Sequence, residues 1–245
     1  MTTPDARSAD APLPDPFPTD WTRCLVLVAH PDDPEYGMSP AVARWTAEGR
    51  SVVYVLASSG EAGIEGMLPS VAGPIREEEQ RRSSAVVGVD QVEFMGFPDS
   101  RIVNNAELRD SIADAIRRHR PDVVLSLYSG PEFAPGFPNQ SDHMEFGEAV
   151  MAAYDDVVAA VGVDASEGRP TTLFESSPEA THYVDVEGFV ELAVDALAEH
   201  SEYLSVLDPG TPVREQARKQ VEMVTEARED LAGGRPVVGF RRMRP

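Results

Sequence analysis

Short apolar runs alternate with longer amphipathic stretches along residues 21–231. Runs long enough for a strand occur at residues 24–29, 52–57, 91–95 and 122–127. Nearly continuous apolar character is typical of strands that are covered on both faces, as in a parallel sheet. Helices are predicted between these runs, at residues 40–49, 76–87 and 106–120. Strands and helices alternating at this spacing predict an α/β fold, a Rossmann-like three-layer domain with a mostly parallel sheet.

The second half of the chain continues the pattern with less regularity. We predict a Pro/Gly-rich loop at residues 129–139, strands at 172–175 and 182–186, and helices at 143–161, 187–204 and 214–231. Residues 1–20 are rich in proline and poor in apolar residues, which indicates a flexible arm or an extended strap across the surface. Residues 232–245 are predicted to form a loose Gly/Arg-rich tail. The expected organisation is an arm, a single domain at residues 21–231 and a tail.

The charge balance excludes several classes of function. The 245 residues contain 21 Lys and Arg against 42 Asp and Glu, a formal net charge of −21. Nucleic-acid binding needs a basic surface, so no nucleic-acid partner is expected, and the acidity favours neutral or cationic small substrates. No apolar stretch approaches the roughly 18 residues that cross a bilayer, and the N-terminus lacks a basic-then-apolar signal pattern. We therefore predict a cytoplasmic protein with no membrane partner.

Titratable side chains gather where the first predicted strand ends, in residues 30–35, which read His-Pro-Asp-Asp-Pro-Glu. The reactive site of an open parallel sheet lies at the carboxyl ends of its strands. His30 and Asp33 are spaced so that they can offer one nitrogen and one oxygen to a single metal ion, with Asp32 left free beside it. Zinc accepts mixed nitrogen and oxygen ligands, and a catalytic zinc ion typically has three protein ligands and a water molecule. A simpler alternative is that the segment caps the following helix and binds nothing.

A third ligand has to come from another part of the chain. Of the five histidines, His143 follows the loop after the fourth predicted strand, at the same edge of the sheet, and is the best candidate. Cys24 is the only cysteine, which excludes a cysteine-based zinc site and an intrachain disulfide. A His/Asp/His site with an open position suits metal-assisted hydrolysis. His119 is interpreted as a surface residue, and His200 as either part of a pocket wall or a helix-end residue.

Several segments carry a resemblance to a known family. The most specific is Ala-His-Pro-Asp-Asp-Pro-Glu at residues 29–35. It is followed in order by segments at residues 56–63, 76–79 with 87–89, 94–99, 141–143 and 198–201. Together they resemble the motifs of the PIG-L/LmbE-like zinc-dependent N-acetylglucosaminyl deacetylases, over residues 23–204.

The resemblance implies a zinc site with a neighbouring general base. His30, Asp33 and His143 would bind zinc, and Asp32 would take a proton from zinc-bound water and pass it to the leaving amine. Nitrogen and oxygen ligands also accept Fe²⁺ or another divalent metal.

The resemblance also implies residues that contact the substrate. Arg76 and Asp99 match positions that hold sugar hydroxyls, and Glu61 matches a carboxylate at the pocket edge. Structural roles are the alternatives, because Arg76 can pair with neighbouring glutamates and Asp99 can cap a turn after Pro98.

The chain departs from the family pattern at the position of a histidine that helps to stabilise the oxyanion, where it has Gln140. Gln140 can donate a hydrogen bond but carries no titratable proton. Either Gln140 substitutes as an uncharged donor, or His182 or Tyr128 takes the role, or activity is weak. Residues 39–40, Ser-Pro, replace the family's Gly-Gly and are expected to stiffen the pocket rim.

The resulting prediction is a hydrolase that removes an N-acyl (acetyl) group from an N-acetylglucosaminyl-type small molecule, an amide or amino sugar. Two alternatives remain: an amidase similar to mycothiol S-conjugate amidase, and a non-catalytic relative that binds metal or sugar. The arginines of residues 232–245 indicate either a solvated tail or a subunit contact in a homo-oligomer.

Overall fold

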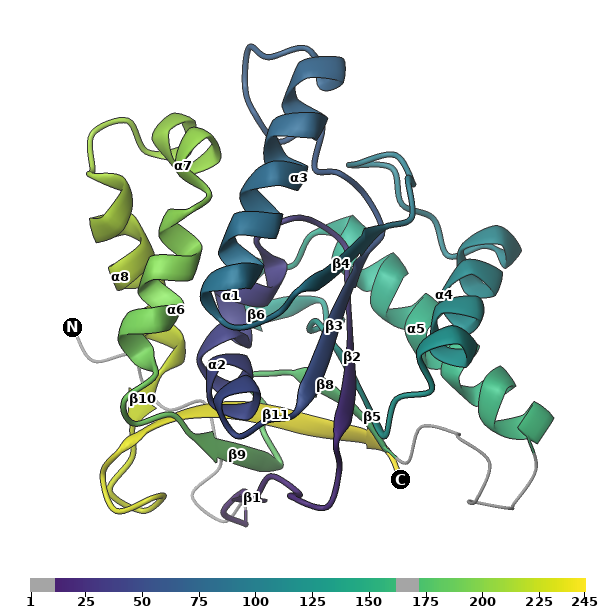
Figure 1. The fold of residues 1–245 in the computed structure, drawn as a ribbon, viewed down its shortest axis with the longest axis vertical. Helices are drawn as coiled ribbons and strands as arrows, with labels where there is room; N and C mark the ends of the chain where they lie inside the picture. The colour runs from purple at the N-terminus through teal and green to yellow at the C-terminus, as the bar shows by residue number, and fades with distance from the viewer. Residues whose placement is uncertain (1–11, 162–171) are drawn as a thin grey trace.

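A mixed sheet forms the centre of this computed structural model, which describes residues 12–161 and 172–245 (Figure 1). The described strands follow the order β1-β9-β11-β8-β5-β2-β3-β4, with β10 paired to β11. Their bounds are β1 Asp15–Pro16, β2 Arg23–Val28, β3 Ser51–Leu56, β4 Gln91–Phe94, β5 Val123–Ser126, β8 Thr172–Ser176, β9 His182–Asp185, β10 Glu226–Ala227 and β11 Pro236–Arg244. A separate hairpin pairs β6 (Glu132–Ala134) with β7 (Phe137–Pro138).

The parallel part of the sheet confirms the predicted α/β class. Strand β2 pairs in parallel with both β3 and β5, β3 pairs with β4, and β5 pairs with β8. In the middle of β2, Val26 lies opposite Tyr54 on one side and Leu125 on the other. All three side chains are buried, as expected for strands covered on both faces.

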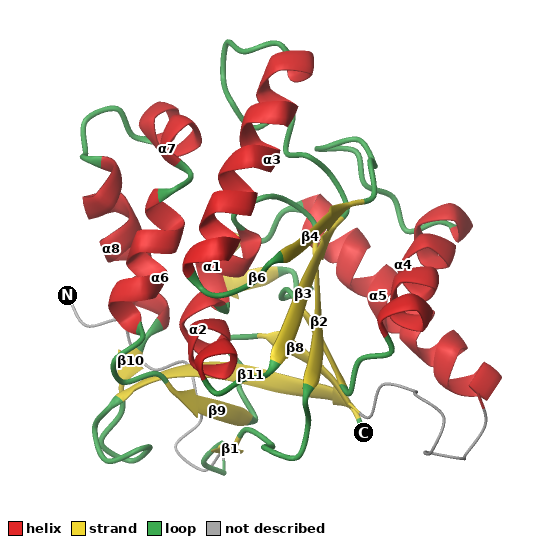
Figure 2. Cartoon of the chain, in the orientation of Figure 1, coloured by secondary structure: helices red, strands yellow, loops and turns green. Residues whose placement is uncertain are grey.

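Helices cover the two faces of the sheet (Figure 2). Helices α4 (Ala106–His119) and α5 (Ser141–Val161) pack against each other on one side. The opposite side carries α1 (Asp33–Gly37), α2 (Ser39–Ala47), α3 (Pro69–Val86), α6 (Val190–Ala198), α7 (Ser201–Leu207) and α8 (Val213–Val224). The carboxyl ends of β2, β3, β4 and β5 therefore open into loops between two helical layers, and these loops carry the candidate site.

The prediction of a loose tail at residues 232–245 is wrong. Residues Pro236–Arg244 form β11, which is inserted between β8 and β9 and is antiparallel to both. Phe240 in this strand is fully buried and packs against the rings of Phe17 and Trp45. The buried residues Val237, Val238 and Phe240 lie in the first half of the strand, and the arginines that suggest a tail follow them in the second half.

The predicted N-terminal arm lies partly outside the described residues, at residues 1–11. In the described part, β1 pairs in parallel with β9 and Phe17 is buried against Phe174. The described part of the arm is therefore extended, with residues 15–16 forming a short strand at the edge of the sheet and Phe17 buried in the core.

Several helix boundaries also differ from expectation. The helix predicted at residues 187–204 is two helices, α6 and α7, separated at His200, whose ψ of 48° is not helical. Helix α3 begins at Pro69, before the predicted start at residue 76, and continues through Pro74. Helix α8 ends at Val224, before the predicted end at residue 231.

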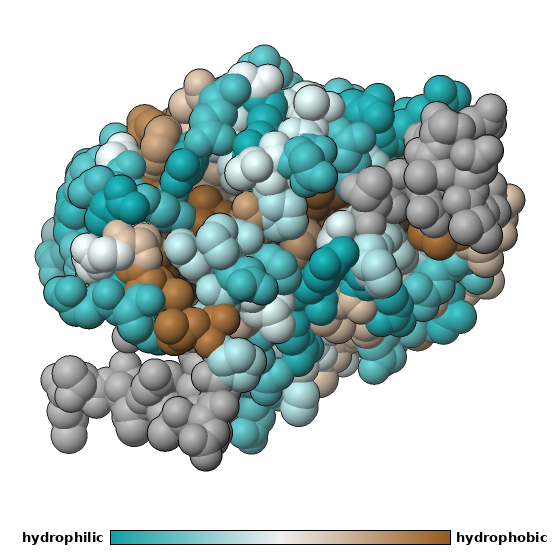
Figure 3. Space-filling model, turned by 90° about the horizontal axis from the view of Figure 1, so that it is seen from below, coloured by the Kyte–Doolittle hydropathy of each residue, from teal (hydrophilic) through white to brown (hydrophobic). Residues whose placement is uncertain are grey.

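The surface is largely hydrophilic on the face seen from below, with smaller hydrophobic areas between (Figure 3). Among the described helices, none has both the length and the apolar character needed to cross a membrane.

Candidate metal centre

The residues predicted to bind a metal come together at the carboxyl end of β2. His30 lies in the loop after β2, and Asp33 is the first residue of α1. The first turn of α5 supplies His143. One ligand atom from each of the three lies within 4.8 Å of the other two. Oδ1 of Asp33 is 3.1 Å from Nε2 of His143, and Oδ2 of Asp33 is 3.6 Å from Nδ1 of His30. The imidazole rings themselves are 5.3 Å apart between centroids.

Backbone groups hold the Asp33 carboxylate in place. Its Oδ2 accepts hydrogen bonds from the backbone N–H groups of Ala29 at 3.0 Å and His30 at 2.7 Å. Burial raises the pKa of Asp33, but His143 and His30 outweigh this effect and keep the pKa below its usual value. Asp33 is therefore held as a carboxylate between two imidazoles.

The orientation of His143 depends on Asn139, at the end of the preceding loop. The side-chain nitrogen of Asn139 donates to the carbonyl oxygens of Tyr128 and Gly130, so its Oδ1 faces Nδ1 of His143 at 3.0 Å. Nδ1 must then donate to this oxygen, and Nε2 is the nitrogen that faces Asp33. Nε2 is buried and faces Oδ1 of Asp33 at 3.1 Å. A buried ring nitrogen whose orientation is fixed from the far side of the ring is well placed to bind a metal ion.

Two carboxylates orient the other imidazole. Nε2 of His30 lies 3.2 Å from Oδ1 of Asp99 and 3.2 Å from Oδ2 of Asp142. Burial lowers the pKa of His30, but the hydrogen bonds with Asp142, Asp33 and Asp99 raise it well above its usual value overall. The arrangement directs Nδ1 toward Asp33, and a carboxylate on the far nitrogen is the usual support of a metal-binding histidine.

The charges of the site fit a divalent cation. Asp32, Asp99 and Asp142 are buried, and Asp33 is half-buried. Within the described part of the chain, ion pairs join these four carboxylates to one guanidinium, that of Arg76, and to the two imidazoles. Buried carboxylates in excess of their positive partners are costly unless a cation neutralises them. Two imidazoles and a carboxylate are ligands that zinc and similar metals accept.

Asp32 lies beside the candidate ligands without belonging to their group. Its Oδ1 is 3.3 Å from Nη2 of Arg76. Burial raises the pKa of Asp32 to about 6, with Arg76 acting in the opposite direction. A buried carboxylate of this kind can accept a proton near neutral pH.

Arg76 is buried behind Asp32. Its guanidinium donates to the carbonyl oxygens of Gly60 and Pro31, at 3.1 Å and 2.7 Å, and lies 4.1 Å from the centre of the Tyr203 ring. A side chain on Gly60 or Gly63 would collide with the guanidinium, which explains glycine at both positions. These contacts point to Arg76 as a support for Asp32.

Glu61 and Asp99 join two neighbouring loops. The backbone N–H of Asp99 donates to Glu61 Oε1 at 2.9 Å, and Asp99 Oδ2 accepts from the backbone N–H of Ala62 at 2.8 Å. Burial raises the pKa of Asp99, but the hydrogen bond with His30 and the other nearby donors lower it overall. Glu61 also lines a cleft of about 210 Å³ with Ser59, Pro69, Gly73, Pro74, Glu77, Gly96 and Phe97.

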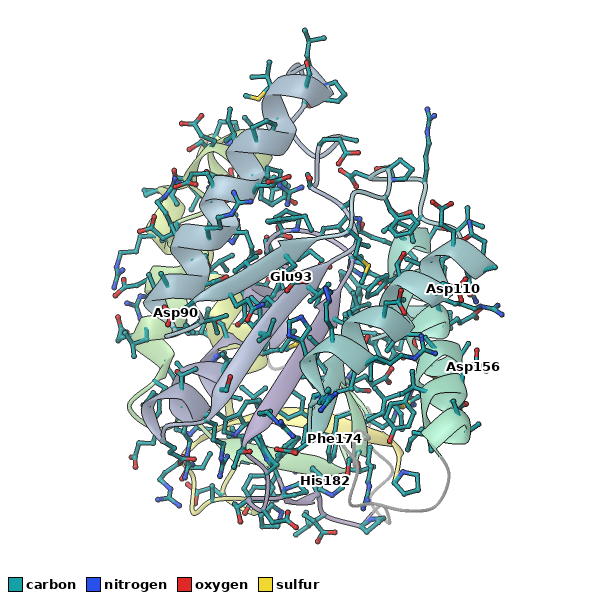
Figure 4. The ribbon with its side chains drawn as sticks, turned by 45° about the vertical axis from the view of Figure 1, so that its right-hand side comes forward. Asp90, Glu93, Asp110, Asp156, Phe174 and His182 are labelled. Atoms are coloured by element: carbon teal, nitrogen blue, oxygen red, sulfur yellow. The ribbon has the colours of Figure 1, made fainter. Side chains whose placement is uncertain are left out.

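The three residues considered for oxyanion stabilisation lie in different environments. The side chain of Gln140 is exposed, immediately before α5. Tyr128 contacts the ring of Phe133, which in turn meets His143 edge-on at 6.4 Å and is 44 % exposed. His182 packs against Phe17 and Phe174 and contacts the hydroxyl of Thr181 (Figure 4). The contacts of His182 thus belong to the aromatic cluster around β9.

Several residues that shape the site were not predicted. Asn139, Asp142, Gln80, Tyr203 and Phe133 each contact a predicted site residue. Asn139 and Asp142 lie within four positions of His143, so their proximity was a usable signal. Gln80 and Tyr203 approach from distant helices, and nothing local to residues 30–35 indicates them.

Comparisons with known proteins agree with this geometry. Residues 25–154 match the PIG-L family model, described as GlcNAc-PI de-N-acetylase. The diacetylchitobiose deacetylase of Thermococcus kodakarensis is 27 % identical over 203 residues, which cover 78 % of this chain and 73 % of that protein. A Bacillus anthracis protein named "Probable N-acetyl-alpha-D-glucosaminyl L-malate deacetylase 2" is 28 % identical over 84 % of this chain and 90 % of its own length.

Solved structures support the fold. N,N'-diacetylchitobiose deacetylase from Pyrococcus horikoshii has a TM-score of 0.75 at 19 % identity, covering 92 % of this chain and 85 % of that one. The 4-carboxy-2-hydroxymuconate hydratase of Pseudomonas putida shares the fold with a TM-score of 0.62 at 19 % identity, covering 91 % of this chain and 97 % of that one. The fold alone therefore does not determine the reaction. The matched family model spans the candidate ligands from His30 to His143, and the chain belongs to the PIG-L family.

Proposed function

We propose that this protein is a metal-dependent hydrolase that removes an N-acyl group, acetyl in the simplest case, from an N-acetylglucosaminyl-type small molecule. The observation that carries the proposal is the grouping of His30, Asp33 and His143 within 4.8 Å, with Asp32 beside them and outside the group. The relatives named as deacetylases of acetylated glucosamine compounds support the choice of substrate class.

In this proposal, His30, Asp33 and His143 hold the metal, and zinc is the expected ion, with Fe²⁺ or another divalent ion as alternatives. When bound, such an ion lowers the pKa of water and polarises an amide carbonyl. Metal binding requires neutral imidazoles and an ionised carboxylate at these three positions, and the lowered pKa of Asp33 meets the second requirement.

Asp32 acts as the general base. It accepts a proton from the attacking water molecule and then transfers that proton to the nitrogen of the leaving amine, so that the C–N bond breaks and a carboxylic acid and an amine are released. Arg76 holds the Asp32 carboxylate through the ion pair of 3.3 Å and stabilises its charged form.

The substrate lies between the loops that follow β3, β4 and β5. Asp99 and Glu61 stand at one side, where their carboxylates can accept hydrogen bonds from sugar hydroxyls. Phe133, half exposed and in contact with His143, forms an apolar wall on the other side. Gln140 supplies an uncharged N–H donor for the oxyanion, in place of a histidine.

The test starts with the metal content of protein purified without added metal, followed by acetate release from a panel of N-acetylglucosaminides and larger amides. We expect about one bound metal ion per chain and metal-dependent acetate release. Asp32→Asn should lower kcat by about 10²- to 10⁴-fold, because general-base catalysis contributes this much, while the metal stays bound.

Asp110→Asn is the matched control, since it makes the same change on the exposed side of α4 (Figure 4). It should leave both kcat and metal content unchanged. Acetate release by Asp32→Asn at the parent rate would show that the assignment of the base is wrong. A metal-loaded parent protein that hydrolyses no compound of the panel would favour the non-catalytic alternative.

A further inference from the structure

The backbone of Asp32 adopts a conformation that side chains rarely occupy. Its φ is 87° and its ψ is −23°, in the left-handed region. Only a few per cent of non-glycine residues have a positive φ, and aspartate is among the residue types that tolerate this conformation. The carbonyl of Asp32 accepts hydrogen bonds from Glu35 N–H at 2.8 Å and Tyr36 N–H at 3.1 Å, which begin α1. The amide N–H of Asp32 is left to be satisfied by something outside the loop.

Gln80 of α3 satisfies this N–H. Its side-chain oxygen accepts a hydrogen bond from Asp32 N–H at 2.7 Å, and the residue is fully buried. The side-chain nitrogen of Gln80 lies 3.2 Å from each carboxylate oxygen of Glu35 and 3.2 Å from the hydroxyl of Ser84. An amide oxygen cannot replace the nitrogen toward a carboxylate, so these contacts determine which end of the amide faces Asp32.

Glu35 is itself held deep in the molecule. It is fully buried in α1, and Nε2 of His200 lies 3.4 Å from its Oε2. His200 is also fully buried and stands at the junction of α6 and α7. Residues from α1, α3 and the α6–α7 junction therefore meet directly beneath Asp32.

We propose that Gln80, oriented by Glu35, is a positioning residue that holds Asp32 in its left-handed conformation and so keeps its carboxylate beside the metal ligands. This inference rests on the proposed function of Asp32 as the base. Buried polar groups that are fully paired favour a single backbone conformation. Loss of the Gln80 amide would leave the N–H of Asp32 and the carboxylate of Glu35 without their hydrogen bonds to it. Surrounding residues need to hold a catalytic group within about 0.5 Å of its productive position, so a small displacement of the Asp32 carboxylate is expected to reduce turnover.

The first test replaces Gln80 by methionine, which has a similar length and no hydrogen-bonding amide. We expect kcat to fall about 10- to 100-fold, as is typical for the loss of outer supports of a metal site, with KM and metal content close to those of the parent. Gln216→Met is the matched control. Nε2 of Gln216 lies within hydrogen-bond distance of three carbonyl oxygens in and after α7, those of Leu204, Asp208 and Thr211, so its loss should lower stability without lowering kcat.

An exchange of the two side chains separates positioning from general destabilisation. Gln80→Glu alone places a second carboxylate against that of Glu35 and should lower kcat. Adding Glu35→Gln restores an amide donor facing a carboxylate, and the acceptor for Asp32 N–H is kept. The double variant should recover kcat to within about threefold of the parent, because an amide again faces a carboxylate between positions 80 and 35, with the donor on the other side of the contact.

A crystal structure of the metal-loaded Gln80→Met variant provides a readout that does not depend on activity. We expect φ of Asp32 to leave the region near 87° or the Asp32 carboxylate to shift relative to Arg76. An unchanged Asp32 in that structure, or a parent-like kcat in Gln80→Met, would overturn the inference. If the parent protein hydrolyses no amide, the proposed function fails, and the structure of the variant still decides whether Gln80 positions Asp32.

Discussion

Asn139 controls the chemistry of His143 although it would not touch a metal. Its amide is oriented by two carbonyl oxygens, and this orientation places the imidazole proton on Nδ1. The same oxygen also accepts the backbone N–H of Gln140 at the start of α5. One side chain thus sets both the protonated nitrogen of His143 and the beginning of the helix that carries it.

Asn139→Ala should weaken metal binding by about 10- to 100-fold, because the imidazole is then free to rotate and to protonate either nitrogen. The measurement is the dissociation constant from competition with a chelator. Asn105→Ala is the control, since Asn105 caps α4 through the N–H of Leu108 and should lower stability by about 1 kcal/mol without changing metal affinity. Equal metal affinities of Asn139→Ala and the parent would contradict this role.

Helix α3 links the site to the α6–α8 side of the molecule. Arg76 and Gln80 face Asp32, and Glu79 accepts the backbone N–H of Glu202 at 2.6 Å in the first turn of α7. This hydrogen bond anchors the turn in which Tyr203 covers the guanidinium of Arg76. Helix α3 therefore positions both Asp32 and the segment that shields its support from water.

Strand β11 stabilises the sheet from the end of the chain. Phe240→Ala should lower the free energy of unfolding by about 3–5 kcal/mol, because a fully buried phenylalanine leaves a cavity among Phe17 and Trp45. Urea denaturation measures the change. Met223→Ala, at a side chain that is 73 % exposed, should change stability by no more than about 0.5 kcal/mol. Similar small effects of both substitutions would mean that β11 contributes little to folding.

The protein has one thiol, that of Cys24, and its reactivity reports on unfolding of the central sheet. Cys24 in β2 is 2 % exposed, and burial followed by the charge of Asp122 raises the pKa of its thiol. A thiolate is the reactive form, so Cys24 should react with thiol reagents only when the sheet opens.

Bound metal should slow this reaction, since an ion that binds the folded state alone stabilises it. At a zinc concentration about 100 times the dissociation constant, the stabilisation is about 2.7 kcal/mol and the labelling should be about 100-fold slower. Excess chelator should reverse the effect, and protein in concentrated urea should react rapidly with or without zinc. Identical labelling rates of the folded protein with and without zinc would show that the metal does not stabilise the folded state.

The sequence by itself predicted the α/β class and the parallel strands, because strands covered on both faces are nearly continuous apolar runs. It also predicted which side chains meet at the carboxyl edge: His30 and Asp33 follow one strand directly, and His143 follows the loop after a neighbouring strand. These features depend on local patterns and on the rule that parallel strands end at one edge.

Tertiary structure decided the rest. Strand β11 is a strand because β8 and β9 lie on either side of it, and no local pattern among its arginines shows those neighbours. The same holds for Gln80 and Tyr203, which reach Asp32 and Arg76 from helices far along the chain. A hydrogen bond or ion pair between distant segments depends on where folding places both partners. The candidate ligand residues could therefore be identified from short motifs, whereas the groups that orient them became visible only in three dimensions.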